Sequence, residues 1–137
     1  MQTRRTEPMT VIGAGSWGTA LAILLAREGH PTQLWGRDSA QLDAMRENRR
    51  NMRYLPDAVF PEELQIAADL AEALKVSRDV LIAVPSHAFR ETLESVRPHL
   101  AAHSRVAWAN SASKLTRGRR KLGNPPLTIK SEITSRA

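Results

Sequence analysis

The sequence contains no cysteine, so it can form neither a disulfide nor a thiolate-bound metal site. The spacing of its four histidines suggests no metal site either. No apolar run approaches the roughly 18 residues that a membrane-spanning helix needs, and the first eight residues lack the apolar segment of a secretory signal. This composition suits a reducing compartment, and we expect a cytoplasmic protein.

Aromatic residues make up only 4% of the chain, and all of them precede residue 110. The net charge of +6 is unevenly distributed, because residues 1–109 hold 13 basic and 13 acidic side chains whereas residues 110–137 hold seven basic side chains and one acidic. A non-catalytic protein that binds polyanions through this basic tail is one possible interpretation. Such a tail lacks the interleaved aromatics on which nucleic-acid bases stack, so we expect no specific nucleic-acid partner.

The chain is organised around residues 9–21, which are typical of a short apolar strand, a glycine-rich turn and the start of a helix. Gly13, Gly15 and Gly18 form a G-x-G-x-x-G pattern in that turn. The first glycine permits a tight turn, the second lets a diphosphate approach the backbone, and the third lets the helix lie close to its strand. The N–H groups at the helix start would face the anion. The pattern predicts a dinucleotide site; the alternative is a tight turn that binds nothing.

Strands and helices alternate along the chain, which predicts an α/β fold, a Rossmann-type doubly wound parallel sheet with helices on both faces. The expected strands are residues 9–12, 31–35, 64–66, 79–84 and 104–108. The expected helices run from the glycine turn to Gly29, from an N-cap at Asp38 or Ser39 to about Arg50, over 69–74 and over 88–97. We expect a dinucleotide-binding domain over 1–109 and an irregular, mostly disordered basic tail over 110–137, because the tail buries too little apolar area.

Three loops, residues 13–18, 36–39 and 85–87, would meet at the carboxyl edge of this sheet, where open parallel sheets bind their ligands. The residues after the second strand would meet the adenosine ribose. Arg37 can pair with a 2′-phosphate through two parallel hydrogen bonds, which favours NADP. Asp38 could still serve the ribose 2′-hydroxyl of NAD, and Arg37 could instead be a solvated surface residue. The cofactor is therefore NADP or NAD, with NADP favoured.

Ser86 and His87 follow the strand at 79–84 and suggest a catalytic pair. A triad, however, needs a nucleophile, a base and an orienting acid that converge in space. Ser86 would serve equally well as the N-cap of the next helix. His87 could line the nicotinamide side of the pocket or only cap the loop. We therefore assign no catalytic residue and no metal ligand.

Five segments, in their order and spacing, resemble the amino-terminal domain of bacterial NAD(P)-dependent glycerol-3-phosphate dehydrogenase. They are V-I-G-A-G-S-W-G-T-A-L-A from residue 11, L-W-G-R-D from 34, N-M-R-Y-L-P from 51, V-P-S-H-A-F-R from 84 and V-A-W-A from 106. Family members reduce dihydroxyacetone phosphate to sn-glycerol 3-phosphate, a phospholipid precursor, with NADH or NADPH. The resemblance implies that Ser16, Trp17, Arg37 and Tyr54 touch the dinucleotide. It argues against the other alternative, a different two-domain reductase such as a ketopantoate-type enzyme.

After Ala109 the sequence departs from this family. The family continues Ala-Thr-Lys-Gly, with a lysine that contacts cofactor and substrate, whereas this chain has Ser111 at that position and Lys114 three residues further on. The abrupt change resembles a reading-frame shift with early termination, although a chimeric gene would look the same. Because the family's helical substrate domain is not matched, we expect a truncated form without turnover. Dihydroxyacetone phosphate and glycerol 3-phosphate would be partners only with that domain present.

Overall fold

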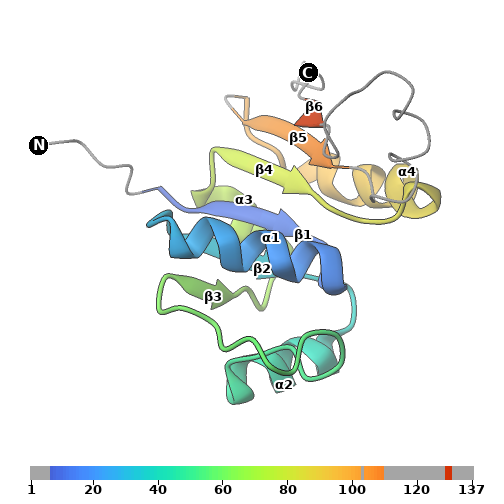
Figure 1. Ribbon diagram of the computed structural model, residues 1–137. Helices are drawn as coiled ribbons and strands as arrows, with labels where there is room; N and C mark the ends of the chain where they lie inside the picture. The colour runs from blue at the N-terminus through green and yellow to red at the C-terminus, as the bar shows by residue number, and fades with distance from the viewer. Residues whose placement is uncertain (1–6, 103, 110–128, 131–137) are drawn as a thin grey trace, which may run out of the picture.

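The chain forms one twisted sheet covered by helices, described here from a computed structural model over residues 7–102, 104–109 and 129–130 (Figure 1). The strands are β1 (Met9–Ile12), β2 (Thr32–Trp35), β3 (Leu64–Ile66), β4 (Asp79–Ile82), β5 (Arg105–Ala109) and β6 (Ile129–Lys130). Their order in the sheet is β3-β2-β1-β4-β5-β6. Strands β1 to β5 are parallel, and β6 is antiparallel to β5. The predicted doubly wound parallel sheet is confirmed.

The helices cover both faces of this sheet. They are α1 (Ser16–Arg27), α2 (Ser39–Asn48), α3 (Leu70–Val76) and α4 (Ser86–Val96), followed by the 3₁₀ turn η1 (Arg97–His99). Because successive strand residues point to opposite faces, Val11 belongs to one core, with α1 and α2, and Ile12 to a second core, with α3 and α4. In Figure 1, α1 lies in front of the sheet and α3 behind it.

Individual residues determine where α1 ends and where α2 begins and ends. Gly29, at a φ of 94°, ends α1 as expected, because a left-handed residue stops a helix at low cost when it is glycine. Asp38 caps α2 with its side chain, as predicted. This helix ends at Asn48, slightly before the expected Arg50, because Arg49 adopts a left-handed φ of 53°. The guanidinium of Arg49 donates to the carbonyls of Pro61 and Leu64, both at 2.9 Å, which ties the helix end to the following loop.

The carboxyl-terminal tail contains one short regular element. Ile129 and Lys130 pair with Ala109 and Trp108 of β5, so the prediction of an irregular tail is wrong for these two residues. The physical reason is that the edge of β5 presents backbone N–H and C=O groups, which any extended segment can pair with. Residues 110–128 and 131–137, over which the tail was predicted to be disordered, lie outside the described residues.

An ion pair joins β4 and β5 at the amino ends of these strands. The Arg105 Nε lies 2.9 Å from the Asp79 Oδ1, and the two residues are register partners. The hydrogen bond to Asp79 and the charge of that carboxylate raise the pKa of Arg105. None of the helices in the described part of the chain has the length and hydrophobicity needed to cross a bilayer.

Candidate functional site

A cleft of about 590 Å³ lies at the carboxyl ends of β1, β2 and β4. Its walls come from the loops that follow these strands, from the start of α1, from the loop between α2 and β3, and from α4. All the residues predicted as cofactor contacts line it, namely Gly13, Gly15, Ser16, Trp17, Gly18, Arg37 and Tyr54. This is the edge at which doubly wound sheets bind ligands, so the fold brings the predicted site together.

The three glycines of the turn have different surroundings. Gly13 has a φ of 122°, and a Cβ there would lie 2.3 Å from the carbonyl oxygen of Ala83. A Cβ at Gly18 would lie 1.8 Å from the carbonyl oxygen of Gly13, so only glycine fits. A Cβ at Gly15, in contrast, would have nothing within 4 Å. The fold therefore requires Gly13 and Gly18, whereas the absence of a side chain at Gly15 leaves open space beside the backbone.

The start of α1 suits an anion. Gly15 is its N-cap, so no side chain satisfies the N–H groups of the first turn, and this turn contains no acidic residue. Those N–H groups and the helix dipole make the N-terminus partially positive. A phosphate at this point would gain both hydrogen bonds and favourable electrostatics. The open space at Gly15 and the uncapped helix start together fit a diphosphate.

Trp17 adds an unpaired donor to the cleft wall. Its Nε1 is shielded from solvent and has no hydrogen-bond partner among the described residues. A buried donor without an acceptor is uncommon in folded proteins. Because Trp17 lines the cleft, this fits a site in which a ligand supplies the acceptor.

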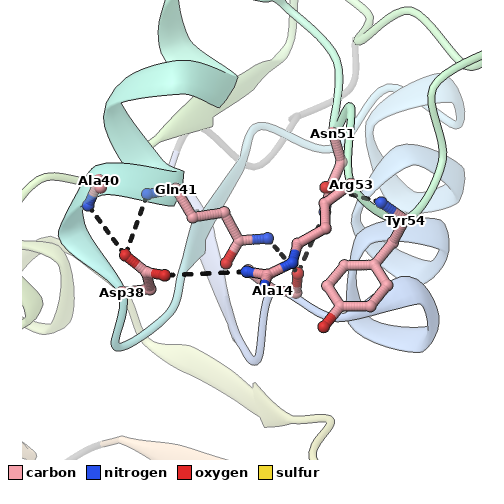
Figure 2. A network of polar contacts seen from close by, with 7 residues as sticks. All are labelled: Ala14, Asp38, Ala40, Gln41, Asn51, Arg53 and Tyr54. Atoms are coloured by element: carbon pink, nitrogen blue, oxygen red, sulfur yellow. Dashed lines mark hydrogen bonds and ion pairs between the residues drawn. The ribbon is translucent and has the colours of Figure 1, made fainter.

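Charged residues gather beyond β2, where an adenosine ribose would be recognised (Figure 2). The Oδ1 of Asp38 accepts hydrogen bonds from the backbone N–H groups of Ala40 and Gln41, at 3.0 and 3.2 Å. Its Oδ2 lies 3.9 Å from the Nη1 of Arg53. The Nη2 of Arg37, the residue before Asp38, lies 3.5 Å from the Oε2 of Glu91 in α4. Two arginines, each beside a carboxylate, therefore flank this end of the cleft.

A buried amide holds the glycine turn in place. Asn51 is fully buried, and its Nδ2 donates to the carbonyl of Ala14 at 3.1 Å and to the Oγ1 of Thr19 at 2.9 Å. Gln41 donates to the same Ala14 carbonyl at 3.1 Å (Figure 2). The Oδ1 of Asn51 accepts from the N–H of Tyr54 at 3.2 Å. The loop that carries Tyr54 is thus fastened to the turn that carries the glycines.

Sequence reasoning assigned no role to Asn51 or Arg53. Both belong to the segment N-M-R-Y-L-P, which was used only for the resemblance. The sequence did offer a signal. The cation Arg53 directly precedes the predicted contact Tyr54, and the polar residue Asn51 lies three positions before it. Nothing in residue order shows that this loop returns to the glycine turn, because the contact between Asn51 and Ala14 spans 37 residues.

Ser86 and His87 are the first two residues of α4. Pro85 occupies the N-cap position of α4 and Ser86 is the first helical residue, so the interpretation of Ser86 as an N-cap is wrong. Pro at this position has no N–H to satisfy, and its φ of −61° suits a helix start. Neither Ser86 nor His87 is among the residues that line the cleft. Within the described residues no group of three or more His, Asp or Glu could hold a metal ion.

Comparison with known proteins identifies the family. A family model for "NAD-dependent glycerol-3-phosphate dehydrogenase N-terminus" matches residues 8–120. The chain belongs to this family. It is 51% identical over 112 residues to glycerol-3-phosphate dehydrogenase [NAD(P)+] of Haemophilus influenzae, a match that covers 82% of this chain and 33% of that protein. The enzyme of the same name from Serratia marcescens is 51% identical over 111 residues, covering 81% and 33%.

A solved structure supports the same assignment. The crystal structure of glycerol-3-phosphate dehydrogenase from Coxiella burnetii superposes with a TM-score of 0.72 at 40% identity, covering 86% of this chain and 38% of that one. The resemblance stated from the sequence motifs is confirmed, and the alternative families are not favoured. The chain spans about a third of the length of the glycerol-3-phosphate dehydrogenases it matches.

The family match also corrects one boundary. Sequence reasoning ended the resemblance at Ala109, but the family model extends to residue 120. The loss of the Ala-Thr-Lys-Gly motif after Ala109, with Ser111 at the lysine position, was taken as the end of the family sequence. Residues 110–120 lie outside the described part of the chain.

Proposed function

We propose that the cleft binds NAD(P)(H), with the diphosphate against the backbone of residues 13–18. The observation that carries the proposal is the open space at Gly15 beside the uncapped start of α1. Gly13, Gly15, Ser16, Trp17 and Gly18 would hold the diphosphate half, and the uncapped N-terminus provides its hydrogen bonds. Relatives named glycerol-3-phosphate dehydrogenase [NAD(P)+] support this choice of ligand.

The adenosine end would lie between Arg37 and Tyr54, since both line the cleft beyond β2. We propose a preference for NADP over NAD, because Arg37 can form two parallel hydrogen bonds with a 2′-phosphate. Asp38 is less suited to the 2′-hydroxyl of NAD than its position in the sequence suggests. Its Oδ1 already caps α2 and its Oδ2 faces Arg53.

In the reaction of the whole protein, the bound cofactor would supply the hydride that interconverts dihydroxyacetone phosphate and sn-glycerol 3-phosphate, a phospholipid precursor. The part of the task proposed for this chain is to bind and orient the dinucleotide. Orientation matters because hydride transfer needs the two reacting carbons in near-attack geometry. Residues of the β4–α4 region, including Val84 and Pro85, line the same cleft, and we propose that the nicotinamide half extends along them.

Isothermal titration calorimetry on the full chain tests the proposal. We expect saturable binding of both NADPH and NADH, with NADPH tighter. Arg37→Ala should reduce the preference for NADPH, whereas Arg46→Ala should not, because Arg46 pairs with Asp43 on the exposed side of α2. A folded sample that binds neither dinucleotide would overturn the function; an unchanged preference in Arg37→Ala would overturn the role of Arg37.

The remaining predictions concern the organisation and location of the chain. We propose that residues 1–109 form the dinucleotide-binding domain, which limited proteolysis should leave intact while it trims residues 110–137. The cytoplasmic location expected from the composition also stays a prediction. Fractionation of cells that express the tagged chain tests it.

A further inference from the structure

We infer that Arg53 is a second specificity-determining residue for the adenosine 2′-phosphate, acting with Arg37 from a different loop. The inference rests on the proposed binding of NAD(P)(H). Residues that read the ribose are expected directly after β2, where Arg37 and Asp38 lie. Arg53 instead comes from the loop between α2 and β3, yet it lines the same cleft.

Asp38 brings a negative charge to the cleft that Arg53 lines. A carboxylate at this position would repel a 2′-phosphate, since like charges a few ångströms apart disfavour each other. Asp38 cannot simply turn away, because its Oδ1 is held by the N–H groups of Ala40 and Gln41 at the start of α2. Arg53, 3.9 Å from its Oδ2, is the cation that offsets this charge. Without Arg53, the ribose end of the cleft would hold an uncompensated carboxylate.

The guanidinium of Arg53 is available to a phosphate. Its side chain is 60% exposed, and the ion pair with Asp38 is long for a charge-assisted hydrogen bond. Exposed ion pairs of this kind contribute little stability. A phosphate dianion offers more charge and a geometry that suits a guanidinium fork. Arg53 can therefore bind a 2′-phosphate while it stays close to Asp38 and offsets the charge of that carboxylate.

Contacts within the protein position Arg53 before any ligand binds. Its guanidinium lies over the ring of Tyr54, 5.6 Å from the centroid, and Figure 2 shows the two side chains side by side next to Asp38. The N–H of Tyr54 donates to the buried Asn51, which in turn holds the carbonyl of Ala14. The backbone next to Arg53 is thus connected to the diphosphate turn. A ligand seated on that turn would place its adenosine end at a set distance from Arg53.

A second hollow of about 300 Å³ lies beside the main cleft, between α2 and the loop that carries Arg53. Asp38, Gln41 and Arg53 line both spaces. The Asp38–Arg53 pair therefore stands at the boundary between them.

The test is calorimetry of the full chain with NADPH and NADH for wild type, Arg53→Ala, Arg53→Gln and the control Arg46→Ala. Loss of a charge-assisted contact predicts that both Arg53 variants bind NADPH about tenfold more weakly, with a much smaller change for NADH. Arg46→Ala, which removes an arginine paired with an aspartate outside the cleft, should change neither. Circular dichroism and urea unfolding confirm that each variant is folded.

The outcomes separate this inference from the function on which it rests. If wild type binds neither dinucleotide, the proposed function fails. If both bind but the Arg53 variants weaken them equally, Arg53 only supports the loop and the inference fails. In an Asp38→Asn background, Arg53→Ala should cost less NADPH affinity than in wild type, because the charge that it offsets is gone. An equal cost in both backgrounds would contradict the compensating role.

Discussion

Gly15 and Gly18 lie in the same turn, but their substitution should have opposite consequences. Gly15→Ala should leave the free energy of unfolding within about 1 kcal/mol of wild type, because its Cβ would have nothing within 4 Å and its φ of −84° suits alanine. The same methyl group would occupy space proposed for the diphosphate. We expect binding of NADPH and NADH to be lost or greatly weakened, as measured by calorimetry on a folded sample.

Gly18→Ala is the matched comparison. Its Cβ would lie 1.8 Å from the carbonyl oxygen of Gly13, a backbone atom that cannot move aside alone. We therefore expect a clear loss of stability, of about 1–3 kcal/mol or more, as for other overpacked sites. Urea unfolding of the two variants side by side measures the difference. Full-strength binding by folded Gly15→Ala would contradict the proposed path of the diphosphate.

Asn51 stabilises the glycine turn through buried hydrogen bonds. Asn51→Ala should lower the free energy of unfolding by about 1–3 kcal/mol, because it leaves the carbonyl of Ala14 with only the Gln41 amide and deprives Thr19 and Tyr54 of a buried partner. Binding of both dinucleotides should weaken together, since the side chain acts on the shared turn. A variant that changes the preference between NADPH and NADH, instead of both affinities, would contradict this supporting role.

At the scale of elements, the start of α2 combines two roles in one carboxylate. Asp38 caps the helix through Oδ1 and brings negative charge to the ribose end of the cleft. Asparagine caps helices about as well as aspartate, whereas alanine costs about 1 kcal/mol. Asp38→Asn should therefore keep the stability of wild type and increase the preference for NADPH. Asp38→Ala should also increase that preference, but it should be less stable than wild type.

Denaturant midpoints and calorimetric affinities of the two Asp38 variants separate these effects. The preference for NADPH should rise in both, because both remove the charge, and only the alanine variant should unfold at lower urea. An unchanged preference in Asp38→Asn would show that this carboxylate does not face the ribose.

At the scale of the whole molecule, the described residues form the cleft that we propose for the dinucleotide. Hydride transfer to a ketone also needs groups that hold the substrate phosphate and stabilise the developing oxyanion. The chain spans about a third of the length of the named enzymes. We expect the 137-residue chain to bind dinucleotide but to show no ketone reduction. An absorbance assay at 340 nm with NADPH and dihydroxyacetone phosphate checks this, and turnover above background would contradict it.

Much of the fold was predictable because its signals are local. The buried runs at β1 and β4, the capping aspartate Asp38 and the stop at Gly29 all depend on neighbours within a few residues. The pairing of Ile129 and Lys130 with β5 was missed for the opposite reason. Strand pairing at an edge depends on a partner distant in sequence, and two residues are too few to show a period.

The five parallel strands, the glycine turn and the family could all be predicted from spacing along the chain. Which charges share the cleft depends instead on how the chain folds in space. Asn51 reaches the glycine turn across a long loop, Arg53 meets Asp38, and Arg37 meets Glu91 of α4. These contacts depend on how loops fold back over the sheet edge, which residue order does not specify. The physical distinction is that backbone preferences are local, whereas the electrostatics of a site come from side chains that the fold brings together.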